Sequence, residues 1–197
     1  VYDYSVLESR LKELAYLNKD LKIELADERN ADDIKTEEFL FEGGIKDFLN
    51  EIIDDEKIID DVIYMADKMQ IEEAKEVETV DENGNTVKKH RSAKFVEVEI
   101  AMNYTTSQRE NVYSFVNNIN THEGGTHVSG FRTALTRTIN DIAKQMNLIK
   151  DKNGTFQGTD VREGLVCVIS VKIPEPQFEG QTKIILTNLH LLVRLKG

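Results

Sequence analysis

The spacing of apolar residues near the N-terminus predicts a helix. Ser5 and Glu8 have the spacing of a capping box, which marks a helix start. Apolar residues then recur at helical steps, namely at Leu7, Leu11 and Leu14. We expect this helix to end near Asn18.

A hairpin and a shorter helix are predicted next. Residues 21–25 alternate between apolar and charged side chains, as a half-buried strand does. After the polar stretch 27–36, a second strand is predicted to start at Phe39 and to include Phe41. Gly43-Gly44 ends it, and the apolar face over residues 45–53 predicts a short helix.

Strand signals dominate the middle of the chain. Residues 62–65 form a short apolar run, residues 71–80 alternate in part, and Asn83-Gly84 is a strong hairpin signal. Apolar and mostly charged residues alternate over 96–102, which predicts a strand with one solvent-exposed face. Residues 112–117 are another strand candidate. These pieces predict an antiparallel or mixed sheet, not a regular βαβ array.

The second half contains the clearest helix and the most apolar strand. The helix is predicted to start after Gly124-Gly125, because apolar residues recur at steps of three and four from Val128 to Met146. Residues 151–158 are polar and predict a loop. In residues 165–173 both the odd and the even positions, which would face opposite sides of a strand, are largely apolar. This pattern predicts a central strand with both faces buried. The mixture of helices and strands indicates an α+β fold.

Composition narrows the class of protein. The chain has 197 residues, of which 40% are hydrophobic and 31% charged, as in an ordinary globular domain. One cysteine allows no internal disulfide, and no apolar run is long enough for a membrane span, so we expect a cytoplasmic protein without a membrane partner. The net charge of −11 argues against nonspecific coating of DNA by the whole surface. Acidic residues concentrate over 24–82, so an anion contact is expected in the more balanced second half.

Three familiar catalytic patterns nearly occur. Gly125 and Gly130 have the spacing of a P-loop, but the Lys-Ser/Thr that should follow is missing. His122 and His127 are one residue too far apart for a zinc-protease helix, on which they would point about 140° apart. Cys167 lies in a predicted buried strand and is interpreted as a core residue. No metal or nucleophilic site is therefore predicted.

Three segments have both a structural and a functional interpretation. Gly124-Gly125-Thr126-His127 stands at a helix start, which suits either an anion site or a plain turn with an N-cap. Arg132 and Arg137 are the solvated flank of a helix or contacts for an anion. Gln181-Thr182-Lys183 follows the predicted central strand, and a lysine on such a loop could reach a phosphate, although any surface loop can contain these residues.

The order of motifs along the chain resembles one family. The segment at 104–119 runs into HEGGTH at 122–127 and GFRTALTRT at 130–138. DVREGL at 160–165, PEPQF at 174–178 and QTK at 181–183 follow. This order closely resembles the second, transducer domain of the B subunits of bacterial type IIA DNA topoisomerases, that is gyrase and topoisomerase IV. The resemblance extends over residues 3–183, and FEGGI at 41–45 favours gyrase.

The resemblance implies a particular fold and domain layout. In that family the transducer has a fold related to a domain of ribosomal protein S5, with a mixed sheet, helices packed on one face and a left-handed βαβ crossover. The transducer would occupy residues 1–183, and residues 184–197 would be a tail or the start of an exit helix. The motifs of the family's ATP-binding (GHKL) domain do not occur in this chain, so the fragment alone is expected to be inactive.

The resemblance also implies roles for individual residues. Lys183, assisted by Gln181, would contact the γ-phosphate of an ATP bound with Mg²⁺ mainly by the ATP-binding domain. Thr182 and residues 124–127 would support this loop. The expected partners are DNA, the chain's own ATP-binding domain, a second B subunit in a dimer, and the A subunit. An alternative is a DNA-holding module in which Arg132, Arg137 and Lys144 contact phosphates.

Overall fold

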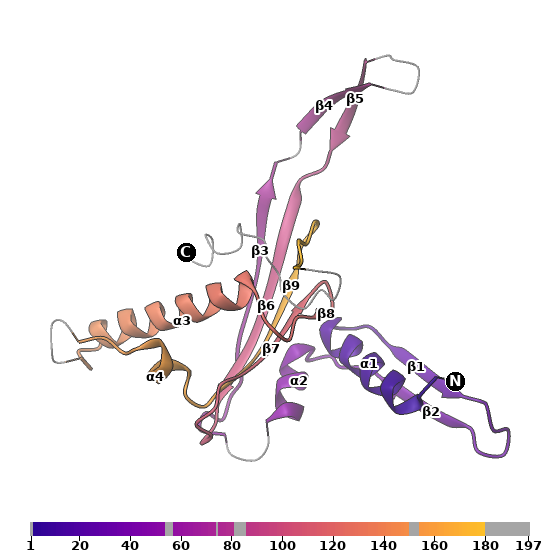
Figure 1. Ribbon diagram of the computed structural model, residues 1–197, viewed down its shortest axis with the longest axis horizontal. Helices are drawn as coiled ribbons and strands as arrows, with labels where there is room; N and C mark the ends of the chain where they lie inside the picture. Colours follow the sequence, from indigo (N-terminus) through magenta and orange to yellow (C-terminus); the bar gives the residue numbers. More distant parts are fainter. Residues whose placement is uncertain (1, 54–56, 74, 81–85, 150–153, 180–197) are drawn as a thin grey trace.

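A five-stranded mixed sheet forms the centre of the molecule (Figure 1). The computed structural model describes residues 2–53, 57–73, 75–80, 86–149 and 154–179. Its helices are α1 (Tyr4–Leu17), α2 (Ile45–Ile52), α3 (Thr126–Gln145) and α4 (Gly158–Arg162). Its strands are β1 (Ile23–Asp27), β2 (Lys35–Phe39), β3 (Ile63–Glu72), β4 (Lys75–Val80), β5 (Thr86–Arg91), β6 (Lys94–Tyr104), β7 (Asn111–Val116), β8 (Ile119–Asn120) and β9 (Leu165–Lys172). None of the helices in these described ranges has the length and hydrophobicity to cross a bilayer.

The strand β9 is the middle strand of the sheet, as its sequence predicts. The strand order is β3-β6-β9-β7-β8. β9 pairs antiparallel with β6 and parallel with β7, so the sheet is mixed, and α3 and α4 lie between the parallel strands in the chain. The predicted mixed α+β class is therefore confirmed. The hand of this crossover and the kinship with ribosomal protein S5 stay predictions.

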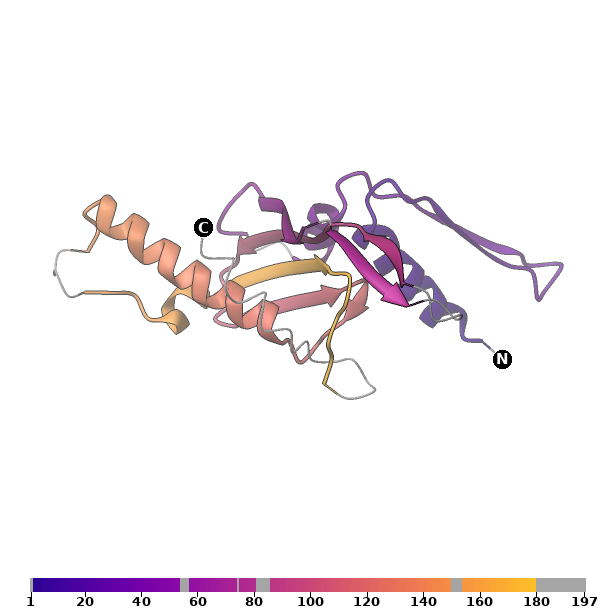
Figure 2. The ribbon, with the colours of Figure 1, turned by 90° about the horizontal axis from the view of Figure 1, so that it is seen from above.

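Helices cover both faces of the sheet, so the prediction that they pack on one face is wrong. On one face, α3 packs against alternate residues of β6 and β9, including Ile100 and Ile169. On the other face, α2 and the end of α1 pack against the intervening residues, including Ala101 and Val168. Figure 2 shows α3 and α1 on opposite sides of the strands. The physical reason is that β9 is apolar on both alternations, and each apolar face must be removed from water.

The N-terminal helix and hairpin form with different ends from those predicted. The N-cap of α1 is Asp3, whose Oδ1 accepts a hydrogen bond from the backbone N of Ser5 at 3.0 Å, so the predicted capping box at Ser5 is wrong. The hairpin is confirmed, because β1 and β2 pair antiparallel with Ile23 opposite Phe39. However, β2 ends at Phe39 instead of starting there. The first four residues of β2 are exposed, so no apolar alternation marked this strand.

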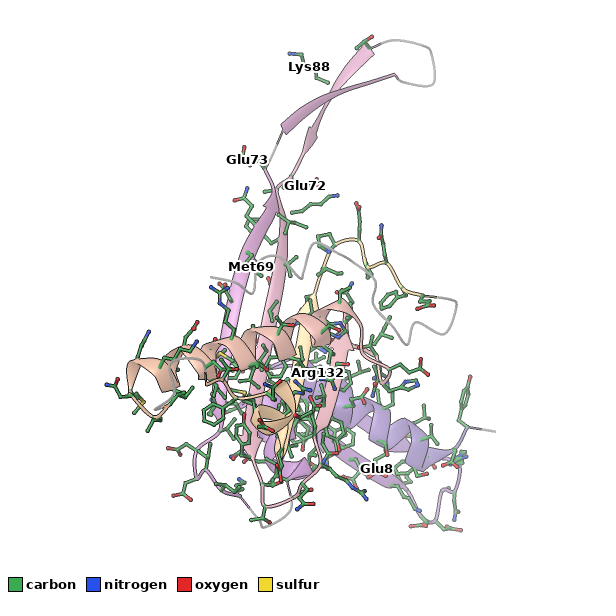
Figure 3. The ribbon with its side chains drawn as sticks, turned by 60° about the vertical axis from the view of Figure 1, so that its left-hand side comes forward. Glu8, Met69, Glu72, Glu73, Lys88 and Arg132 are labelled. Atoms are coloured by element: carbon green, nitrogen blue, oxygen red, sulfur yellow. The ribbon has the colours of Figure 1, made fainter. Side chains whose placement is uncertain are left out.

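A long two-stranded ribbon continues one edge of the sheet. β3 runs for 10 residues, well beyond the predicted 62–65, and β4 and β5 pair as the Asn83-Gly84 signal predicts. In Figure 3, Glu72 and Glu73 lie at the base of the β4–β5 ribbon and Lys88 lies further along it, away from Arg132 beside the sheet. Most of β3 is exposed, which is why hydrophobic periodicity failed to show its length.

The short helix α4 falls partly within the segment 151–158 that the sequence predicts to be a loop. A reciprocal capping box starts this helix: the side chain of Gln157 accepts from the backbone, and Asp160 Oδ2 accepts from Gln157 N at 2.9 Å. Its single buried residue is Val161. One buried residue in five gives no period for sequence analysis to detect.

Candidate functional site

The segment that follows β9 is tied to the rest of the sheet by an asparagine. Asn117 N donates to Val171 O at 2.8 Å, which continues the parallel pairing of β7 with β9. The side chain of Asn117 then donates from Nδ2 to Ile173 O at 2.8 Å and accepts at Oδ1 from Ile173 N at 2.9 Å. One amide thus satisfies both backbone groups of Ile173, the residue from which the predicted phosphate-contacting loop departs.

Asn117 is placed by a tight turn between β7 and β8. Asn117 and Asn118 have φ values of 49° and 64°, and the flanking residues Val116 and Ile119 pair across the turn. A two-residue turn with both φ values positive matches the twist of a β-hairpin, and asparagine tolerates this conformation better than most residues. The local sequence therefore fixes where the Asn117 amide starts, and β9 supplies its partner.

Two further contacts hold residues 173–179. Glu175 Oε1 lies 2.7 Å from Lys94 Nζ at the start of β6, and Phe178 packs against the core on the α3 face. The Glu175 side chain is 77% exposed, so this ion pair contributes little to stability. The predicted contact residues Gln181, Thr182 and Lys183 lie outside the described residues, so their roles stay predictions.

The predicted loop-support segment, Gly124 to His127, forms the start of α3. Gly124 and Gly125 have φ values of 82° and 141°, which suit glycine, and Gly125 is the N-cap. Thr126 begins the helix and His127 is only 1% exposed. The structure thus shows a tight turn that leads into a buried helix start, and the predicted support of the loop stays a prediction.

A buried polar cluster joins this turn to β7. The Ser114 hydroxyl donates to Thr121 O at 2.7 Å, and the Thr121 hydroxyl donates to Ser114 O at 3.0 Å. His127 Nε2 lies 3.2 Å from Thr121 Oγ1. Burial lowers the pKa of His127 to about 4, because the charged imidazolium is poorly solvated there. His127 is therefore neutral at neutral pH and acts in packing.

Arg132, a predicted anion contact, is held by the carboxylate of Glu110, the residue that directly precedes β7. Glu110 Oε1 lies 2.7 Å from Arg132 Nε on α3, and Glu110 Oε2 lies 3.3 Å from Arg162 Nε on α4. Glu110 and Arg132 line a cleft of about 330 Å³ between β7 and the turn before α3, together with His122 and Glu123. One carboxylate thus binds two helices to the sheet, and the charge of Arg132 is partly compensated.

The other two predicted anion contacts lie on the outer surface of α3. Arg137 and Lys144 are exposed, and their separation of seven residues puts them on nearly the same side of the helix. Arg137 Nε lies 3.7 Å from Asp141 Oδ2, and both of these side chains are more than half exposed. Arg132 points to a different partner, so the structure groups Arg137 with Lys144 but not with Arg132.

The residues of the failed catalytic patterns take structural positions. Cys167 is 0% exposed in β9, and burial raises the pKa of its thiol to about 12, which confirms its interpretation as a core residue. His122 is exposed and precedes α3, whereas His127 is buried within it. Among the described residues, no three side chains of His, Cys, Asp or Glu are grouped to hold a metal ion.

Two site residues were missed by sequence analysis. Asn117 lies in an Asn-Asn pair between two apolar residues, which is a two-residue hairpin signal that could have been found. Its partner Ile173 is 56 residues away, and nothing in either segment indicates the contact. Glu110 is one of many acidic residues, and no local pattern distinguishes it.

The fold and these contacts define a class: an α+β domain on one mixed sheet, whose central strand leads into an anchored segment at residues 173–179. The sequence model of the DNA gyrase B family matches residues 44–192. Over 95% of the chain, the DNA gyrase B subunit of Streptococcus pyogenes serotype M1 is 48% identical, and that of Halalkalibacterium halodurans is 45% identical. The chain belongs to the DNA gyrase B family. It spans about a quarter of the length of these relatives, 25% and 26%.

Solved structures agree with this assignment. The 43K ATPase domain of Thermus thermophilus gyrase B, in complex with an aminocoumarin, matches 99% of this chain and 45% of that chain. Its TM-score is 0.73 at 29% sequence identity. The topoisomerase IV ATP-binding domain of Francisella tularensis has a TM-score of 0.65 at 24% identity, and this likeness concerns the fold alone.

Proposed function

We propose that this chain is the transducer domain of a DNA gyrase B subunit. In this role it couples ATP binding and hydrolysis in a neighbouring GHKL domain to movements of the DNA gate during strand passage and supercoiling. Residues 1–183 form the transducer, and residues 184–197 are a tail or the start of an exit helix. The likeness to gyrase relatives, at 45–48% identity, favours gyrase over topoisomerase IV.

The observation that carries the proposal is the anchored segment at the end of β9. The QTK motif begins two residues after the last described residue, Glu179, and the chain leading to it is held by Asn117, Lys94 and the core. A loop that couples ligand binding to the orientation of a rigid domain needs such a fixed base. If the base moved freely, ligand binding would shift the equilibrium between domain orientations less. The central position of β9 supplies the rigid body.

In the proposed mechanism, Lys183 and Gln181 contact the γ-phosphate of ATP, which the GHKL domain holds with Mg²⁺. A hydrogen bond to a charged group contributes about 1.5–3 kcal/mol. Two such contacts shift an equilibrium between domain orientations by roughly two to four powers of ten, at about 1.4 kcal/mol per tenfold. Loss of the γ-phosphate on hydrolysis removes this bias. Thr182 and residues 124–127 support the loop, and the partners are a second B subunit, the A subunit and DNA.

The test is Lys183→Ala in a full-length gyrase B protein that carries this segment, assayed with its gyrase A partner and DNA. We expect the kcat for ATP hydrolysis to fall about tenfold to a hundredfold, the effect of losing one charge-assisted contact. Lys19→Ala, which changes an exposed lysine after α1, is the matched control and should leave turnover unchanged. Wild-type turnover in Lys183→Ala would contradict the proposal.

A second candidate function is a DNA-holding surface on α3. The exposed, same-side placement of Arg137 and Lys144 favours it, whereas the pairing of Arg132 with Glu110 weakens it. Charge reversal at both positions would then reduce duplex binding by the full-length protein and lower its salt dependence. If binding and its salt slope stay unchanged, this candidate is excluded.

A further inference from the structure

The Asn117 side chain holds the residue from which the predicted loop departs. The Asn117 amide makes two hydrogen bonds to Ile173, and Ile173 is 7% exposed. Without the amide, the backbone N–H and C=O of Ile173 would lose these partners at the edge of the core. Leaving such poorly solvated groups unpaired lowers the stability of the fold. Pro174 and Pro176 follow directly and restrict the backbone, so the direction of the chain is largely set at Ile173.

The other anchors control direction less well. The Lys94–Glu175 pair is exposed on the Glu175 side and joins two flexible side chains. Phe178 makes apolar contacts, which are not directional. The paired hydrogen bonds of Asn117 are directional, and they extend the parallel pairing of β7 and β9 by one more residue.

We propose that Asn117 is a positioning residue for the loop that carries Lys183. The inference rests on the proposed function of Lys183 and assigns the positioning of its loop to the Asn117 amide, not to the β7–β8 turn as a whole. The chain that continues to Lys183 leaves β9 through Ile173, so the two hydrogen bonds of Asn117 set the direction in which that segment starts. A loop whose starting direction is fixed loses less conformational entropy when it binds, so preorganisation by Asn117 would strengthen a contact with the phosphate.

The neighbouring residue of the turn provides an internal comparison. Asn118 also has a positive φ, but its Nδ2 donates to Asn18 Oδ1 at 3.2 Å, and its carbonyl accepts from Arg10 Nη2 at 2.6 Å. Asn118 therefore joins the turn to α1 and its C-cap, whereas Asn117 joins it to the end of β9. The two asparagines share a backbone conformation and differ in what their amides hold.

The decisive variant is Asn117→Gly, because glycine keeps the positive φ and removes only the amide. In the full-length protein we expect the kcat for ATP hydrolysis to fall about tenfold, as for two hydrogen bonds partly replaced by water. The KM for ATP should change less than about twofold, since the GHKL domain supplies most of the binding. In a Lys183→Ala background, Asn117→Gly should have almost no further effect on kcat.

Two matched controls separate positioning from general damage. Asn118→Gly changes the same turn, and Asn140→Ala removes another amide that bridges a backbone N–H and C=O, those of Phe156. Both variants should keep kcat within about twofold of the wild type. A tenfold loss in either control would overturn the inference, because the effect would then follow from loosening any part of the domain.

The two proposals can fail separately. If Lys183→Ala turns over normally, the proposed role of the lysine is wrong. If Lys183→Ala is slow but Asn117→Gly is not, or if their losses multiply in the double variant, only the positioning role is wrong. Hydrogen exchange in Asn117→Gly gives a direct check: the Ile173 amide should exchange about tenfold faster than in the wild type, and an unchanged rate would overturn the inference.

Discussion

The two ends of β9 are held by different physical means. At its first end, Gly164 has a φ of 74°, and a Cβ there would lie 2.3 Å from Thr105 O and 2.9 Å from Ser107 O. Backbone packs directly on backbone, and Thr105 N donates to Gly164 O at 2.9 Å. At its last end, the Asn117 side chain stands between the strands and supplies both hydrogen bonds to Ile173.

The two ends of β9 therefore differ in how a single substitution would affect them. The first end has no spare volume, and nearby Glu110 also ties α3 and α4 to the sheet. This end serves as the fixed reference of the domain. The last end is held by two directional hydrogen bonds of one side chain, so its direction depends on Asn117 and not on close backbone packing. The proposed phosphate-sensing loop leaves from that end.

The largest expected effect tests the rigidity of the first end. Gly164→Ala places a Cβ against two carbonyl oxygens and forces a non-glycine residue to a positive φ, so we expect a loss of about 3–4 kcal/mol in unfolding free energy. Chemical denaturation of the purified protein measures it. Gly158→Ala is the comparison, because its φ is not positive and its Cβ would meet side chains and no backbone, namely the Arg162 guanidinium at 2.6 Å and Thr136 Oγ1 at 3.5 Å, so its loss should stay below about 1 kcal/mol.

An intermediate effect concerns pH and the polar cluster beside the last end. The folded pKa of His127 is about 4, below its usual 6.5, so between these values the unfolded chain binds a proton that the folded chain does not. Stability therefore falls as pH falls from about 6.5 to about 4, by roughly 2 kcal/mol at pH 5. His127→Gln lacks this proton, and its loss between pH 7 and pH 5 should be smaller by that amount. Equal losses in both proteins would show that the cluster is insensitive to pH.

The smallest expected effect concerns the ion pairs at the first end. Glu110→Gln keeps the shape of the side chain but removes the charge shared by Arg132 and Arg162, and we expect a loss of about 1 kcal/mol in unfolding free energy. The exposed Lys94–Glu175 pair is the comparison, and Glu175→Gln should cost less than about 0.5 kcal/mol. If both variants lose the same amount, Glu110 is no special anchor of the reference end.

Elements with a local hydrophobic pattern of their own are predictable from the sequence. β9 is apolar on both alternations and is the central strand, and the steps from Val128 to Met146 gave α3 almost to its ends. The strand β2, most of β3 and the helix α4 are not predictable in this way, because they are exposed or short. Hydrophobic periodicity in the sequence indicates that one face of an element is buried. An element without a buried face shows no such periodicity.

By itself, the sequence determined the α+β class, the central strand, the main helix and the family, because these depend on local periodicity and on the order of motifs. The tertiary structure alone decided that both faces of the sheet are covered, that Glu110 joins two arginines, and that Asn117 holds Ile173. Each of these contacts joins segments far apart in the chain. Which residues come into contact depends on how the helices and the sheet pack together. This packing depends on several segments at once and cannot be inferred from any one of them.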